Sequence, residues 1–286
     1  MKKTVISSSN LSPFFTTALQ EVQVWLRISG YAATSIRGCS WTLKRLFSWM
    51  QEKGYTHLDK PILLEYLLFL EDKAWSENTY RITFYGIKKY LQYLFMIRRI
   101  NIDVTLREYQ HIYPSPIYLS LLQIQQLYAY MDSHPNKNRY RVLFAVLYAA
   151  GLRISEALAL KLSDIDYQRK GLVVRRGKGG KRRFVPLVAR PLYDIKTYIL
   201  QSRPQPQAAS AAYLLLSDYG HAKSSGMIYY HLKKLALAND IPPFGAHVLR
   251  HSIATHLLQS GMSIYQIKDF LGHKTLTSTQ IYTHYE

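Results

Sequence analysis

A set of basic and hydroxyl side chains in the second half of the sequence has the types that phosphate chemistry requires. Arginine presents planar, paired donors that match phosphate oxygens and stabilise the charge that grows in a transition state. His247 lies three residues before Arg250 on a predicted helix, so the two side chains share a face. Taken singly, each residue also has an ordinary structural interpretation. The side chains that could act on a phosphodiester are Arg153, Lys178, His247, Arg250, His273 and Tyr282.

Two other chemistries fit the sequence poorly. The stretch from Gly171 to Gly179 has five residues between its first two glycines and no Ser or Thr after Lys178, so it is not a nucleotide-binding P-loop. His247 and His251 have the spacing of zinc-protease ligands, but no Glu stands between them and a cation does. The chain has a single cysteine and hence no thiolate cluster. We therefore expect no metal and no cofactor.

The first part of the sequence is predicted to be all helical. Apolar residues recur with helical spacing over 14–29, 34–53, 61–73 and 78–99, and Ser76 is a plausible cap for the last of these helices. Pro114 and Pro116 interrupt any helical pattern. We therefore expect a four-helix domain over 1–107 and a linker over 108–118.

The second part, 119–286, is predicted to be mostly helical with one small antiparallel sheet. Helices are expected at 121–132, 140–150 and 155–162, with Ser120 as a cap, and again from about residue 213 to the end. β-type runs at 172–176 and 183–187 flank a glycine-rich basic tip. Pro186 indicates an edge strand. The fold class is mainly α: an N-terminal four-helix domain and a mixed, mostly helical second domain.

Five motifs in this order resemble the tyrosine recombinase (phage integrase) family, and its Xer-type members most closely. They are Gly151-Leu-Arg-Ile-Ser-Glu156, Gly177-Lys-Gly179, His247-Val-Leu-Arg-His251, Leu271-Gly-His273 and Tyr282. The resemblance implies that 1–107 is a DNA-binding core-binding domain and 119–286 the catalytic domain. It also implies that the six residues named above form an active site that cuts and rejoins DNA through a 3′-phosphotyrosine, without metal or nucleotide.

The chemistry of these residues agrees with that site. Only about one tyrosine phenol in a thousand is ionised at pH 7, so Tyr282 needs a base or a strongly polarised phosphate. We expect Arg153 and Arg250 to polarise the phosphate, His247 to act as the base, and His273 to bond a non-bridging oxygen. Lys178 would protonate the leaving 5′-oxygen.

Neighbouring residues in the motifs leave some choices open. Glu156 either orients an arginine or is an ordinary first-turn acid of a helix. His251 is interpreted as a structural neighbour. Tyr285 competes with Tyr282 only by its nearness, and the motif selects Tyr282.

The charge of the chain indicates a polyanionic partner. The formal net charge is +19, and residues 1–112 and 113–286 carry net charges of +6 and +13, so both parts are basic. No apolar run is long enough to span a membrane, and Met1-Lys-Lys3 precedes a polar stretch rather than the apolar core of a signal peptide. We expect a prokaryotic cytoplasmic protein, associated with the nucleoid, that binds double-stranded DNA.

Basic residues of the first domain fall on two predicted helices, and more lie beside the hairpin tip. Such residues form either a solvated helix face or contacts to DNA phosphates. Hydroxyl neighbours make the second interpretation equally plausible. The expected DNA-binding residues are Arg37, Lys44, Arg45, Arg81, Lys88, Lys89, Lys181 and Arg182.

The function expected is a site-specific recombinase, forming a homotetramer on synapsed DNA. One alternative is a catalytically silent DNA-binding regulator on the same scaffold, although all six residues are present. A type IB topoisomerase shares the chemistry but is argued against by the small size and Xer-like motifs. Xer-type relatives carry a further C-terminal segment that packs on the next subunit, whereas Glu286 follows Tyr282 by only four residues. We therefore expect weak coupling and a monomer in the absence of DNA. No arm-binding domain is expected before the first helix.

Overall fold

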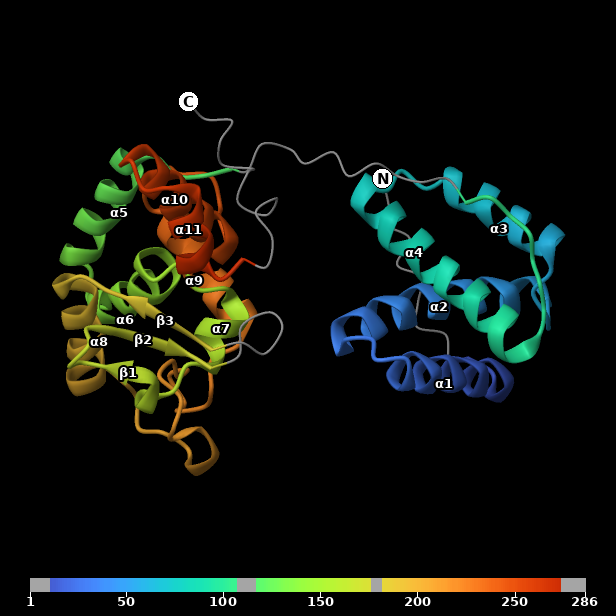
Figure 1. The fold of residues 1–286 in the computed structure, drawn as a ribbon, viewed down its shortest axis with the longest axis horizontal. Coiled ribbons are helices and arrows are strands. Elements are labelled where there is room, and N and C mark those ends of the chain that lie inside the picture. Colours follow the sequence, from blue (N-terminus) through green and yellow to red (C-terminus); the bar gives the residue numbers. More distant parts are fainter. Residues whose placement is uncertain (1–10, 107–116, 176–181, 274–286) are drawn as a thin grey trace. The chain divides into compact units, whose positions relative to one another are not determined.

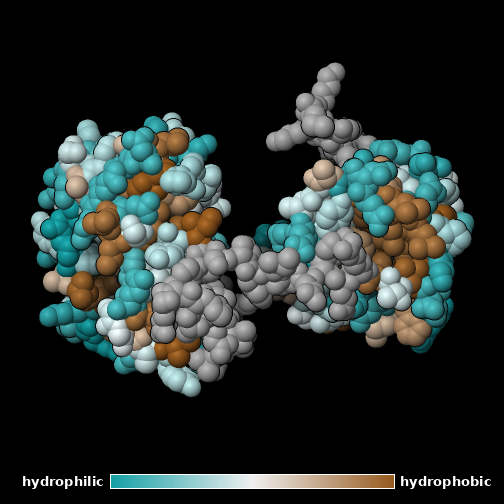
Figure 2. Space-filling model, turned by 90° about the horizontal axis from the view of Figure 1, so that it is seen from above, coloured by the Kyte–Doolittle hydropathy of each residue, from teal (hydrophilic) through white to brown (hydrophobic). Residues whose placement is uncertain are grey.

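The computed structural model describes residues 11–106, 117–175 and 182–273. The chain divides into two compact units, Met1–Ile112 and Tyr113–Glu286 (Figure 1). Each unit has its own hydrophobic core. Within the described ranges, no helix is long and apolar enough to cross a membrane. The space-filling view shows a mostly hydrophilic surface interrupted by hydrophobic patches on both units (Figure 2). The predicted class is confirmed: the protein is mainly helical with one small sheet.

The N-terminal unit is built from four α-helices that carry their own start signals. Ser12, Asp59 and Ser76 each accept a hydrogen bond from a backbone N–H in the first turn of the helix that follows. The Ser76 cap confirms the sequence prediction. The helices are α1 (Pro13–Ile28), α2 (Ala33–Lys53), α3 (Lys60–Glu71) and α4 (Glu77–Tyr93), labelled in Figure 1.

Helices α2 and α4 pack closely because one position has no side chain. A Cβ atom built on Gly86 would lie 2.6 Å from the Cβ of Thr42, so glycine is required for this approach. Ile87 and Leu43 are buried in the core of the unit. The close packing of α2 on α4 places the predicted DNA-binding residues of the two helices near one another in the same unit.

The end of α4 differs from the prediction. We expected one helix over 78–99, but Leu94–Arg98 forms a π-helical turn and Arg99 has a left-handed backbone, with φ of 57°. Phe95, Met96 and Ile97 are exposed. The apolar pattern therefore continues in the sequence after the buried face has ended.

The C-terminal unit contains seven α-helices within the described residues. The first is capped by Ser120, as predicted, in a capping box with Gln123. Residues 140–150, predicted as one helix, instead belong to α6 and a following π-turn, Ala145–Ala149. The helices are α5 (Leu121–Ser133), α6 (Lys137–Phe144), α7 (Ile154–Ala159), α8 (Ala189–Gln201), α9 (Ser225–Leu237), α10 (Ala246–Gln259) and α11 (Ile264–Leu271).

The sheet has three antiparallel strands in the order β1 (Ile165–Asp166), β2 (Gly171–Val174) and β3 (Arg183–Pro186). Strand β3 lies at an edge, as Pro186 predicted. Leu172 pairs with Val185, and both are buried. The two-residue strand β1 was not predicted because it is too short to show an alternating pattern.

Candidate active site

The site begins at a turn that ends one helical segment and starts the next. Gly151 has a left-handed φ of 56°, and a Cβ there would lie 2.8 Å from Leu271 Cδ2. The turn places Arg153 at the N-cap of α7, with Glu156 three residues on. Glu156 Oε2 accepts the Arg153 backbone N–H at 3.0 Å. The first turn of α7 therefore fixes both residues of the motif.

Glu156 is a buried carboxylate that three arginines surround. Its side chain is only 2% exposed. Arg153 Nη1 donates to Oε1 at 3.0 Å, Arg183 donates to both oxygens at 2.9 Å, and Arg250 Nη1 lies 3.9 Å from Oε2. Burial alone would raise the pKa of Glu156, but hydrogen bonds from Arg183 and the Arg153 backbone hold it at about 2. The carboxylate is therefore ionised and orients arginines, which favours the first of the two interpretations made from sequence.

Arg250 is the most deeply buried of the predicted cations that the structure describes. It is 4% exposed and donates from Nη2 to the Leu271 carbonyl at 2.8 Å and from Nη1 to the Gly151 carbonyl. Arg153 Nη2 donates to the Gly272 carbonyl at 3.2 Å. Backbone carbonyls thus hold both guanidinium groups. One carbonyl, of Gly151, lies at the turn before α7, and the others, of Leu271 and Gly272, lie at the end of α11.

His247 and Arg250 lie on α10, and His273 follows α11 and the left-handed Gly272, as the sequence predicted. Burial, then the charges of Arg250 and Arg153, lower the pKa of His247. The same causes lower the pKa of His273 further, to about 3. Both imidazoles are therefore neutral at pH 7, and each can offer one donor and one acceptor.

His251 was interpreted as a structural neighbour, and it lies half-buried on α10. Burial, followed by His247 and Arg250, lowers its pKa to about 4. It therefore adds a third neutral imidazole beside the arginines.

Several predicted site residues lie outside the described residues. These are Lys178, Lys181, Tyr282 and its competitor Tyr285. Most of the predicted linker, from 108 to 116, lies outside them as well. The described chain therefore brings together Arg153, Arg250, His247 and His273.

Arg183 belongs to this cluster, although it was not among the residues predicted for the site. It begins β3 and pairs with Val174, while Val185, two residues on, is fully buried. Alternate residues of a strand share a face, so Arg183 points the same way as Val185. The alternating pattern of this strand could have identified Arg183 from the sequence, because an arginine that points into the protein requires a buried acidic partner.

Within the described residues, no group of three or more His, Cys, Asp or Glu side chains could hold a metal ion. The cluster is instead rich in cations, with Arg153, Arg183 and Arg250 around one carboxylate. Its excess positive charge suits an anion such as a phosphodiester.

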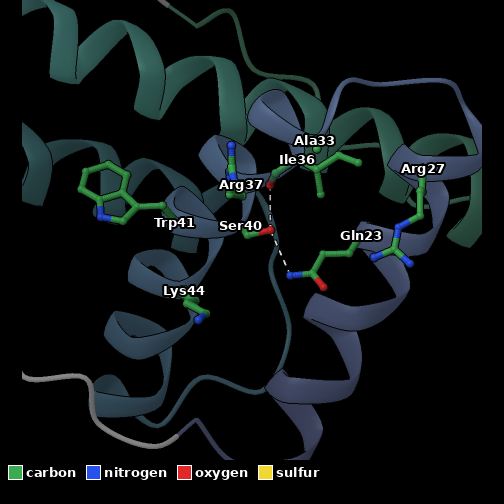
Figure 3. Close-up of a pocket in the computed structure, with 8 residues that line it drawn as sticks. All are labelled: Gln23, Arg27, Ala33, Ile36, Arg37, Ser40, Trp41 and Lys44. Atoms are coloured by element: carbon green, nitrogen blue, oxygen red, sulfur yellow. Dashed lines mark hydrogen bonds between the residues drawn. The ribbon is translucent and has the colours of Figure 1, made fainter. Parts of the chain in front are cut away.

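A second basic feature lies between α1 and α2 of the N-terminal unit. Arg37 and Lys44 line a pocket of about 470 Å³ together with Arg27, which the sequence analysis did not single out (Figure 3). Gln23 Nε2 donates to Ser40 Oγ at 3.0 Å and so joins the two helices at the pocket (Figure 3). Arg37 and Lys44 are exposed.

The other predicted DNA-binding residues are held in different ways. Arg81, Lys88 and Arg182 are exposed, and Arg81 also bonds Asn78 Oδ1 at 2.8 Å. Arg45, by contrast, lies between two indoles, 4.6 Å from the ring of Trp41 and 3.8 Å from that of Trp75.

Lys89 is half-buried and also engaged within the unit. Its Nζ donates to Tyr31 Oη at 2.7 Å and to Gln92 Oε1 at 3.0 Å. Arg45 and Lys89 therefore have structural roles that helix spacing did not indicate.

Comparison with known proteins gives concordant matches. The model of the phage integrase family matches residues 118–286. Tyrosine recombinase XerA of Thermococcus onnurineus is 31% identical over 268 residues, covering 93% of this chain and 89% of the relative. Tyrosine recombinase XerC of Lacticaseibacillus casei is 31% identical over 242 residues, covering 80% and 79%.

Solved structures share the fold. XerH site-specific recombinase bound to palindromic difH substrate, in a post-cleavage complex, superposes with a TM-score of 0.74 at 21% identity, over 94% of this chain and 81% of that one. A lambda integrase dimer bound to a core site gives a TM-score of 0.68 at 15% identity, over 93% and 94%.

Proposed function

The chain belongs to the phage integrase family and is a tyrosine recombinase, an enzyme that breaks and rejoins DNA strands; on this premise we propose that Arg153, Lys178, His247, Arg250, His273 and Tyr282 form its active site. The observation that carries the assignment is the cluster around Glu156. Two arginines from different motifs share that buried carboxylate, and the charges of both arginines act on neutral His247 and neutral His273.

The proposed reaction is a transfer of the phosphodiester from one oxygen to another. The Tyr282 oxygen attacks the phosphorus while its proton passes to His247. The bond to the 5′-oxygen breaks, and Lys178 supplies the proton that this oxygen needs. The product is a 3′-phosphotyrosine and a free 5′-hydroxyl. Since one phosphodiester replaces another, resealing by the reverse steps needs no energy source.

Arg153 and Arg250 stabilise the charge that develops on the non-bridging oxygens. Their guanidinium groups are already fixed by carbonyls and by Glu156, so little reorganisation accompanies the reaction. Neutral His273 donates a further hydrogen bond to a non-bridging oxygen. Neutral His247 is free to accept a proton, which a protonated imidazole is not.

The N-terminal unit is proposed to be the core-binding domain. The exposed cations Arg37, Lys44, Arg81 and Lys88 would contact backbone phosphates of double-stranded DNA, as would Lys181 and Arg182 in the C-terminal unit. The solved relatives bound to DNA support a DNA partner. We further propose a monomer that assembles into a tetramer on synapsed cytoplasmic, nucleoid DNA. Light scattering of the free protein checks the first state, and a stable tetramer without DNA would contradict it.

The assignment of the nucleophile is tested with a duplex nicked near the cleavage site. The nick lets the short strand diffuse away, so wild-type protein is expected to accumulate as a covalent adduct in denaturing gels. Tyr282→Phe removes one oxygen and should retain DNA binding without forming the adduct. Tyr285→Phe is the matched control and should behave as wild type. An adduct from Tyr282→Phe that Tyr285→Phe abolishes would reverse the assignment.

A further inference from the structure

We propose that Arg183 is a positioning residue of the active site, which holds Glu156 in place for Arg153 and fixes the segment that presents His273. The proposal rests on the recombinase active site described above. Arg183 itself reaches no predicted reacting atom. Its action is to hold the groups that do.

The contacts of Arg183 join three elements. Its two terminal nitrogens bond the two oxygens of Glu156 on α7, each at 2.9 Å. Its Nε donates to the Phe270 carbonyl, on α11, at 3.2 Å. The side chain is 12% exposed. Since Arg183 begins β3, one partly buried side chain connects the sheet, α7 and the end of α11.

Arg183 also packs against the residue that precedes His273. A Cβ built on Gly272 would lie 2.9 Å from Arg183 Cδ and from Nη1. Gly272 has a left-handed φ of 69° and its carbonyl accepts from Arg153. The arginine and the glycine therefore fit together, and their contact places Gly272 for Arg153 and His273 for the substrate.

Charge gives Arg183 a second role. Its side chain bonds both carboxylate oxygens, whereas the side chain of Arg153 bonds one and that of Arg250 lies 3.9 Å away. Arg183 is thus the principal counter-ion of Glu156. Without it, the carboxylate would draw Arg153 and Arg250 toward itself and compete with the substrate phosphate.

The same contacts predict how the protonation of Glu156 depends on Arg183. The charged groups near Glu156 are Arg153, Arg183 and Arg250, and Lys161, Asp164 and Arg175 line the pocket that it borders. Burial raises the pKa of Glu156, and the Arg183 hydrogen bond is the largest effect that lowers it. Removing Arg183 therefore raises the pKa of Glu156, and its protonated form no longer holds Arg153 through both contacts.

The experiment measures single-turnover cleavage of the nicked duplex, at saturating DNA, between pH 5 and pH 8. Arg183→Gln is expected to cleave about 10²-fold more slowly than wild type at pH 7, the cost of a misplaced reacting group. DNA affinity should change little. The rate of this variant should also fall as pH decreases through an additional acid limb, beyond the loss that protonation of His247 gives wild type. An unchanged rate, or a pH profile parallel to wild type, would overturn the proposal.

Two further variants separate positioning from general damage. Glu156→Gln/Arg183→Gln removes the titrating group, so the additional acid limb should disappear. Its rate should be below that of Glu156→Gln alone, because the contacts of Arg183 with Phe270 and Gly272 are also lost. If the limb persists in the double variant, another group causes it and the proposal fails. Arg183→Lys keeps the charge but cannot bond both oxygens. It should cleave slowly without a new acid limb, and it serves if Arg183→Gln does not fold; a wild-type rate would refute the role.

Arg190→Gln is the matched control. Arg190 pairs with the buried Asp194 at 3.3 Å in the same unit and has no contact with the cluster around Glu156. Its rate and pH profile should equal those of wild type. The wild-type adduct and its loss in Tyr282→Phe are established first. Failure of that step refutes the proposed function, whereas a normal adduct with an unchanged Arg183→Gln refutes only the positioning role.

Discussion

The cations of the two units carry the same charge but are held in opposite ways. Arg250 is 4% exposed and bonds two backbone carbonyls, and Arg183 is fixed to a buried carboxylate. In the N-terminal unit, Arg37, Lys44 and Lys88 are exposed. A buried, preorganised cation suits one phosphate at one place, whereas exposed side chains can follow a long backbone. The difference agrees with the proposed division between cations of the active site and cations that attract DNA.

Arg45 and Lys89 show that position on a basic helix does not by itself decide whether a cation is exposed to solvent or held within the unit. Both are basic residues on α2 and α4, yet aromatic rings and hydrogen bonds hold them within the unit. They form a third class, in which the charge supports packing.

Loss of a buried arginine should have the largest effect. Arg250→Ala removes two fixed donors, and one such donor is worth about 10²–10³-fold in rate, so cleavage should fall by about 10⁴-fold or more. DNA binding should persist, because the exposed cations remain. Adduct formation and gel-shift affinity are measured together. A loss of affinity as large as the loss of rate would break the division between reacting and attracting cations.

Lys178 is predicted to belong with the reacting groups in spite of its basic neighbours. Lys178→Ala should cleave a normal duplex about 10²–10⁴-fold more slowly, since the 5′-alkoxide leaves poorly without a proton. A substrate with sulfur at the bridging 5′ position should restore the rate, because a thiol of pKa about 8.5 leaves as the thiolate. Arg250→Ala should gain nothing from sulfur. Without rescue of Lys178→Ala, the lysine acts only through its charge.

Acid should weaken the two units at different pH. The pKa of His251 is lowered to about 4 and that of His273 to about 3 in the folded protein, from an ordinary value of 6.5. Their contribution to stability is complete above pH 6.5 and is lost as pH falls toward 3. In the N-terminal unit, hydrogen bonds lower the pKa of Glu21 and Glu65, so their contribution is lost only below the ordinary value of 4.5.

Hydrogen exchange on the full chain can measure both units at once. Between pH 7 and pH 5.5, after correction for intrinsic exchange rates, protection around α10 and α11 should fall while protection of α1 and α3 is kept. His273→Gln should reduce the loss in the C-terminal unit. Equal loss in both units would show that the histidines are not its cause.

The smallest effect distinguishes two adjacent lysines. Lys88→Ala should lower the slope of log affinity against log salt by about 1, because one phosphate contact is lost. Lys89→Ala should leave the slope nearly unchanged and instead lower the thermal midpoint of the N-terminal unit. Binding titrations over a range of salt concentrations and thermal denaturation decide between them. Equal slopes for both variants would return Lys88 to a solvated surface.

Much of the fold followed from the sequence, because the helices bury a regular apolar face. Apart from the end of α4, the helices of the N-terminal unit lie within about two residues of their predicted bounds, and Ser76 and Ser120 cap as expected. The π-turns did not follow, since a wider turn leaves no separate apolar period. Motif order indicated the members of the site, but not that Arg183 and Arg250 share Glu156, because such contacts join distant segments.

The carbonyls that hold the arginines have a consequence for synthesis of the protein. The partner of Arg153, the Gly272 carbonyl, lies 119 residues further along the chain. A nascent chain that has folded α5 to α9 still lacks this partner and the Leu271 carbonyl that orients Arg250. Arg153 and Arg250 can therefore form these hydrogen bonds only after residue 272 has emerged from the ribosome. A chain that ends before these residues therefore cannot hold the two arginines in the arrangement described here.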